Sequence, residues 1–119
     1  MSQLFEQTWE IYTSSWKAAS ADDKRELFEK SLDTVCQYTD PLAKTNGWDE
    51  LLQYMQDFHR QVPGGYFLTT YFMAHHNKSI AKWVMRNGDH IPLSDGISFG
   101  EYNEAGKLVK MTGFFEPLK

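Results

Sequence analysis

The change of hydrophobic periodicity along the chain constrains the fold most strongly. Between residue 2 and about residue 61, apolar residues recur three and four positions apart in three segments, which predicts helices. The cluster Pro63-Gly64-Gly65 ends this part, and polar turn clusters at 76–78, 87–89 and 103–106 divide the remainder into four segments of strand type. Three helices followed by a mostly antiparallel sheet indicate an α+β fold.

The boundaries of these segments follow from local signals. The first helix is expected over Ser2–Ala19, a shorter one opens at Ser20, and the third runs from Gly47 to about Gln61. A short strand should end at Asp40, because the following Pro41 withholds an amide and pushes its predecessor out of helical space. The segment 66–75 is apolar at both parities, as expected for a strand whose two faces are both covered.

Length and charge limit the classes of protein that remain. A chain of 119 residues predicts one domain, 1–119. Its net charge of −4 has the wrong sign for a nucleic-acid partner. No apolar stretch reaches the ~18 residues of a membrane span, so no membrane partner is expected. A single cysteine, Cys36, and an N-terminus unlike a signal peptide predict a cytoplasmic protein.

Three local patterns occur in a distinctive order. They are Tyr38-Thr39-Asp40-Pro41, then Gly47-Trp48-Asp49-Glu50-Leu51, then Asp95-Gly96-Ile97-Ser98-Phe99 leading to Glu104-Ala105-Gly106-Lys107-Leu108. Together they resemble the NTF2-like superfamily, and within it the SnoaL-like polyketide cyclases and the ketosteroid isomerases. The resemblance implies a cystatin-like, NTF2-like cone: three N-terminal helices packed on a curved, mostly antiparallel sheet, with a pocket between them and usually a homodimer.

The same resemblance gives Asp40 a catalytic role, because it occupies the place of the general base of the ketosteroid isomerases. A carboxylate at an apolar pocket mouth is a better base, since desolvation disfavours its anion. The structural alternative is that an aspartate before proline closes the strand by a turn with its own backbone. We keep both interpretations open.

The oxyanion hole of those enzymes is not reproduced. It needs a tyrosine on the first helix and a protonated aspartate on the next-to-last strand, and these positions fall on Trp16 and Ser98. Tyr12 lies one turn before Trp16, which moves its hydroxyl by roughly 5 Å. Because losing one such donor costs ~10²–10³ in rate, we do not expect a faithful ketosteroid isomerase.

A ligand pocket is nevertheless expected inside the cone. Inward parities and helix stripes place Tyr12, Trp16, His59, Trp83, Ser98, Met111 and Phe115 in it, and Gly96 and Gly100 share the face of Ser98. Two alternatives stay open: His59 as a core histidine, and Trp83 as core rather than pocket wall. Which face of the strand over 79–87 lines the pocket is also open. No metal motif occurs, and His75 and His76 should point to opposite faces, so neither a metal nor another cofactor is expected.

Two functions from different classes fit these expectations. The first is binding of a small hydrophobic or aromatic ligand, extended to a cofactor-independent isomerase or cyclase with Asp40 as general base. The second is a non-catalytic binding or dimerisation module of the same fold. A homodimer through the convex face of the sheet is expected in either case, because 66–75 leaves an apolar face that needs cover.

Overall fold

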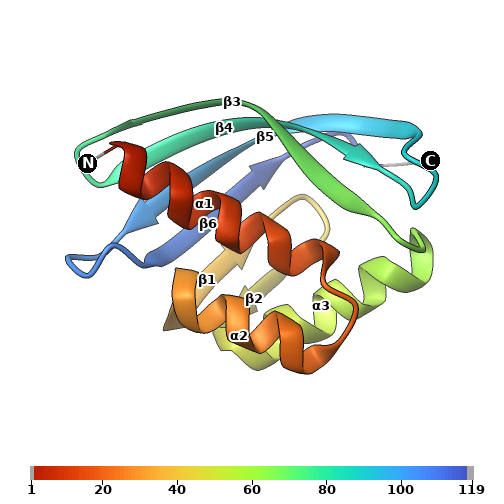
Figure 1. Cartoon of the computed structure of the whole chain (residues 1–119), viewed down its shortest axis with the longest axis horizontal. Coiled ribbons are helices and arrows are strands. Elements are labelled where there is room, and N and C mark those ends of the chain that lie inside the picture. Colours follow the sequence, from red (N-terminus) through yellow and green to blue (C-terminus); the bar gives the residue numbers. More distant parts are fainter. Residues whose placement is uncertain (1, 118–119) are drawn as a thin grey trace.

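The computed structural model describes residues 2–117, and its elements follow the predicted order. The helices are α1 (Ser2–Lys17), α2 (Ala21–Ser31) and α3 (Gly47–Gln61). The strands are β1 (Leu32–Thr39), β2 (Lys44–Asn46), β3 (Tyr66–His75), β4 (Lys78–Arg86), β5 (Pro92–Tyr102) and β6 (Leu108–Phe114). Figure 1 shows α1 lying under the curved sheet, with α2 and α3 below it. The α+β cone is confirmed.

The six strands form one mixed sheet in the order β2-β1-β6-β5-β4-β3. The strand latest in sequence, β6, lies inside this order: it pairs in parallel with β1 and antiparallel with β5. The short β2 was not predicted, because three polar residues show no hydrophobic alternation. It pairs with the end of β1 through Gln37↔Asn46, Tyr38↔Thr45 and Thr39↔Lys44, and so fixes the turn that contains Asp40.

The start of α2 is capped as its sequence indicates. The Oγ of Ser20 accepts a hydrogen bond from the backbone N–H of Asp23 at 3.1 Å. Asp22 and Asp23 lie in the first turn, where their negative charges interact favourably with the positive end of the helix dipole and stabilise the helix. Phe28 on this helix is fully buried in the core, and this burial holds α2 against α1, α3 and β1.

The alternation of β4 decides which of its faces looks inward. Ser79, Ala81, Trp83 and Met85 are buried, whereas Lys82 between them is exposed. The Trp83 face therefore covers the interior. In β3 the pairing register shifts between Thr69 and Tyr71. Before the shift the odd-numbered Phe67 faces the core, and after it the even-numbered Phe72 and Ala74 do.

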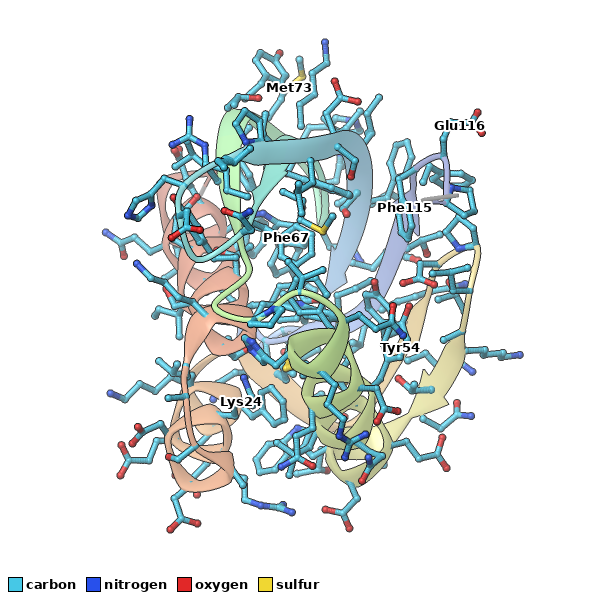
Figure 2. All side chains as sticks on the ribbon, turned by 90° about the vertical axis from the view of Figure 1, so that its right-hand side faces the viewer. Lys24, Tyr54, Phe67, Met73, Phe115 and Glu116 are labelled. Atoms are coloured by element: carbon cyan, nitrogen blue, oxygen red, sulfur yellow. The ribbon has the colours of Figure 1, made fainter. Side chains whose placement is uncertain are left out.

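The outer face of the sheet stays apolar on several strands. Large hydrophobic side chains with 42–56% of their surface exposed lie there, namely Leu68, Tyr71, Met73, Phe99 and Phe114. Figure 2 shows Met73 pointing away from the body of the molecule. Among residues 2–117, no helix has the length and hydropathy to cross a membrane.

Candidate functional site

Asp40 follows the last residue of β1 and is held by its own turn. Its Oδ1 accepts hydrogen bonds from the backbone N–H groups of Leu42 at 2.8 Å and Ala43 at 2.9 Å. This is the structural role expected of an aspartate before proline, in which its side chain closes the strand by a turn. One carboxylate oxygen is therefore committed to the local backbone.

The other oxygen of Asp40 binds two phenols. Its Oδ2 accepts hydrogen bonds from the hydroxyls of Tyr38 at 2.6 Å and Tyr54 at 2.8 Å. Burial, and beyond it the neighbouring Asp40 charge, raises the pKa of both tyrosines above the ordinary value. Both phenols are therefore neutral donors at physiological pH, and with the two amides they bring four donors to the carboxylate.

A cavity of about 490 Å³ opens beside Asp40, between the sheet and α3. Aromatic side chains from helices and strands form most of its wall: Trp16, Tyr38, Tyr54, Phe58, Phe67, Trp83 and Phe115. Figure 2 shows Tyr54, Phe67 and Phe115 around this end of the molecule. The remaining lining residues are Asp40, Leu42, Asp57, Gln61, Val62, Met85, Ser94 and Pro117. Its size is that of a small-molecule site.

Trp16 is the centre of the aromatic wall. Its ring lies 5.3–5.9 Å, centroid to centroid, from the rings of Tyr38, Tyr54, Phe58 and Phe67. The last three are set nearly perpendicular to it, at 76–86°. Edge-to-face pairs of this kind are the favourable packing of aromatic rings, so the wall is ordered by its own contacts.

A second space of about 30 Å³ adjoins the large cavity and shares Trp16, Tyr38, Phe67 and Trp83 with it. Tyr12 and Ser98 line it. The indole N–H of Trp16 donates to the hydroxyl of Tyr12 at 3.0 Å, and that of Trp83 donates to Ser98 Oγ at 2.9 Å. Of the predicted pocket residues, Trp16, Trp83 and Phe115 line the large cavity, and Tyr12 and Ser98 line this second space.

Two residues expected in the pocket lie elsewhere. His59 points towards α2, where its Nε2 is 3.2 Å from the Nζ of Lys24. Met111 is 1% exposed within the packed core and lines neither space. His59 was assigned from its helical spacing alone, which predicts an inward direction but not which neighbour fills it.

Gly96 and Gly100 leave no open space on their strand. A Cβ on Gly96 would lie 2.4 Å from Cζ2 of Trp83, and one on Gly100 would lie 2.8 Å from Ser79 Oγ and 2.9 Å from Leu108 Cδ2. Both glycines allow neighbouring side chains to approach the backbone closely. The side-chain space at these two glycines is thus filled by neighbouring groups, and at Gly96 the ring of Trp83 packs closely against β5.

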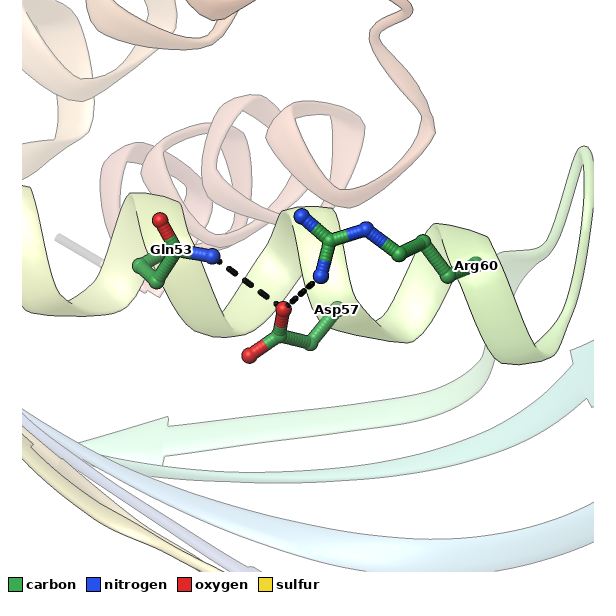
Figure 3. A network of polar contacts seen from close by, with 3 residues as sticks. All are labelled: Gln53, Asp57 and Arg60. Atoms are coloured by element: carbon green, nitrogen blue, oxygen red, sulfur yellow. Dashed lines mark hydrogen bonds and ion pairs between the residues drawn. The ribbon is translucent and has the colours of Figure 1, made fainter.

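A small polar network lies at the mouth, on α3. Asp57 accepts hydrogen bonds from the side chains of Gln53, at 3.1 Å, and Arg60, both through Oδ1 (Figure 3). The Arg60 and Asp57 side chains are 70% and 44% exposed, so this ion pair is a surface pair of small energy. The charge of Asp57 is thus offset locally.

Sequence reasoning missed Tyr38 and Tyr54. Signals for both exist: Tyr38 precedes Asp40 by two positions, which places both side chains on one face of an extended chain, and Tyr54 is one helical turn before Phe58. Within residues 2–117, no three His, Cys, Asp or Glu side chains come together as ligands for a metal ion.

Solved structures share this architecture over nearly the whole chain. One is a candidate isomerase of the SnoaL-like family from Agrobacterium tumefaciens, with a TM-score of 0.88, 18% identity, and 97% of this chain and 99% of that chain covered. Another is an NTF2-like protein of unknown function from Exiguobacterium, with a TM-score of 0.73, 13% identity, and coverage of 93% and 99%. The chain has the NTF2-like fold. A third NTF2-fold neighbour, a candidate SnoaL-like polyketide cyclase from Jannaschia, has a TM-score of 0.78, 8% identity, and coverage of 97% and 87%.

The expected NTF2-like fold is thus confirmed. No protein-family model matches the chain, and no curated protein matches its sequence. Trp16 and Ser98 stand at the positions of the two oxyanion donors of the ketosteroid isomerases. In this NTF2-like cone each has a neighbouring partner: the indole of Trp16 donates to Tyr12, and the hydroxyl oxygen of Ser98 accepts from Trp83. Function must therefore be argued from the Asp40 cluster and the cavity.

Proposed function

We propose that the protein binds a small apolar or aromatic molecule in the large cavity. The observation that carries the proposal is the wall of seven aromatic rings around about 490 Å³, with the hydrogen-bonded carboxylate of Asp40 at its edge. Ligand sites are mostly apolar, with a few placed polar groups that set orientation. Asp40, with Tyr38 and Tyr54, is such a group.

Filling the cavity tests this proposal. Ser94 lines the cavity and is partly exposed, so Ser94→Phe should occupy the space without disturbing the packed core. We expect the variant to melt near wild type and to lose uptake of small aromatic probes, followed by NMR of the indole N–H signals of Trp16 and Trp83. Ser14→Phe, on the exposed side of α1, is the matched control. Unchanged uptake in Ser94→Phe would contradict the proposal.

A second candidate is acid–base catalysis with Asp40 as the general base. It is favoured by the position of Asp40 in the cavity wall. The carboxylate would act only after one phenol, such as Tyr54, yielded its hydrogen bond to the substrate. Deuterium incorporation next to the carbonyl of small aromatic ketones tests it: wild type should exchange faster than Asp40→Asn. Equal exchange rates in both proteins would contradict catalysis by Asp40 and leave only the binding function.

We also propose that two copies associate through the outer face of the sheet. The support is the apolar surface of Leu68, Tyr71, Met73, Phe99 and Phe114, which spans strands β3, β5 and β6. Phe99 and Phe114 pack edge to face at 5.7 Å and form its largest aromatic pair. A second copy would remove this surface from water, and burial of apolar area is the main favourable term in association.

A further inference from the structure

We propose that the ligand of the large cavity is an organic cation: a quaternary ammonium group on an apolar or aromatic body. This inference rests on the proposed function and names the chemical class of its ligand. It follows from the charge of the lining, from the aromatic wall and from the way the polar groups of the site are already used.

The charge of the lining is negative. Its titratable acids are Asp40 and Asp57, and none of the described lining residues is Lys, Arg or His. Asp57 is paired with Arg60 at the exposed mouth, which leaves Asp40 as the uncompensated charge. All four hydrogen-bond partners of Asp40 are neutral, two phenols and two backbone amides. A cation in the cavity would supply the opposite charge, where the dielectric is lower than in water.

The aromatic wall suits the same ligand. A cation over the face of Trp, Tyr or Phe is attracted by the quadrupole of the ring, most strongly when both are desolvated. Trp16, Tyr38 and Tyr54 line the cavity together with the stacked pair Phe58 and Phe67, so a cation in the enclosed space has several rings within reach. Tyr38 and Tyr54 also donate to a carboxylate, which makes their rings richer in electrons.

The use of polar groups in the site selects a fully substituted ammonium. A carboxylate offers about four lone-pair positions, and all of those of Asp40 are taken. A primary amine would have to displace a phenol to be hydrogen-bonded, whereas a quaternary ammonium needs no acceptor. The indole N–H groups of Trp16 and Trp83 are spent on Tyr12 and Ser98. An anion in the cavity would meet the charge of Asp40 and no basic side chain in the described lining.

A pair of probes equal in shape tests the charge preference. They are 3-hydroxyphenyltrimethylammonium and 3-tert-butylphenol, which differ by a charged nitrogen in place of a carbon. Binding is read from the indole N–H signals of the four tryptophans. Trp16 and Trp83 line the cavity, whereas Trp48 donates to Asp33 outside it and reports binding elsewhere. We expect the cation to bind about tenfold or more tighter than the neutral phenol, with shifts at Trp16 and Trp83.

Two variants assign the preference to Asp40. Asp40→Asn keeps the shape of the side chain and should lower affinity for the cation about tenfold while leaving the neutral phenol within about twofold. Asp49→Asn is the matched control: Asp49 lies at the exposed start of α3 outside the cavity and is paired with Arg25, so its loss should change neither affinity.

The outcomes separate this inference from the proposed function. Equal or tighter binding of the neutral phenol, with shifts at Trp16 and Trp83, would overturn the cation and leave the ligand cavity standing. Absence of shifts at these two residues with either probe at millimolar concentration would overturn both proposals. The comparison in wild type decides even if Asp40→Asn fails to fold.

Discussion

The ammonium of Lys24 lies 3.2 Å from Nε2 of His59, and it also donates to the carbonyl oxygens of Ser15 at 2.8 Å and Ala18 at 2.6 Å. Both carbonyls belong to the C-terminal end of α1, where unpaired oxygens and the helix dipole favour a positive charge. Lys24 is 1% exposed. A lysine of α2 thus joins the end of α1 to α3 through neutral acceptors.

This arrangement predicts a pH dependence of stability. Burial lowers the pKa of Lys24 to about 8 from its ordinary value of 10.5. Between these values Lys24 binds more protons in the unfolded chain than in the folded one, so its contribution makes the free energy of unfolding rise with pH, whereas Cys36, whose pKa burial raises to about 11, acts in the opposite direction above about pH 9. Urea denaturation at about pH 7.5 and about pH 9.5 measures the rise. Lys24→Met should abolish it, and a rise of equal size in that variant would contradict the assignment.

Removing the Asp40 carboxylate should destabilise the protein. Asp40→Ala leaves the hydroxyls of Tyr38 and Tyr54 and the amides of Leu42 and Ala43 without their acceptor, which we expect to cost ~2–4 kcal/mol. Asp40→Asn keeps an acceptor for the amides and should cost about half as much. Urea denaturation of the two variants provides the comparison, and equal losses would mean that the turn contributes little.

Gly100 should not tolerate a side chain. A Cβ there would press against Leu108 and against Ser79, whose hydroxyl is hydrogen-bonded to Tyr102 at 2.9 Å. Gly100→Ala should therefore cost ~1–3 kcal/mol by overpacking, with probe uptake in the cavity unchanged. Thermal melting and the same probe titration check both parts. A neutral substitution would show that the core beneath α1 yields more easily than its distances suggest.

Association of two copies should depend on the outer face of the sheet. Sedimentation equilibrium at tens of micromolar should give twice the chain mass of 13.9 kDa. The variant Phe114→Lys should be more monomeric than wild type, because it places a charge in the apolar contact. Val35→Lys alters another exposed apolar position, 77% exposed on β1, and should not. A wild-type species of 13.9 kDa under these conditions would contradict the dimer.

Periodicity predicted the helices and long strands because each buries one face or both. It could not predict β2, whose three residues are polar and are held by pairing with β1. Nor could it reveal the register shift in β3 between Thr69 and Tyr71, after which the opposite set of alternate residues faces the core. Both features depend on a neighbouring strand, and a single segment carries no signal for them.

The site shows the same division. Asp40 and Trp16 were found, one through a motif and the other through a helix stripe, and both are local signals. The partnership of His59 with Lys24 was not, since a lysine buried against helix carbonyls has no sequence pattern of its own. Gly100 had the correct parity, but Leu108 and Ser79 occupy the space before it, and these contacts arise only in three dimensions.

The position of β6 in the sheet has a consequence for how the chain reaches its folded state. β1 and β2 lie on one side of β6, and β3, β4 and β5 lie on the other, so the two halves of the sheet are joined only through this late strand. Pairing Leu32 with Leu108 closes a loop of most of the chain, and such non-local contacts slow folding. During synthesis the helices and the β3–β4–β5 meander can form early. The two sheet halves that carry Tyr38 on one side and Phe67 and Trp83 on the other come into one sheet only when β6 pairs with both, so the aromatic wall depends on the last strand made.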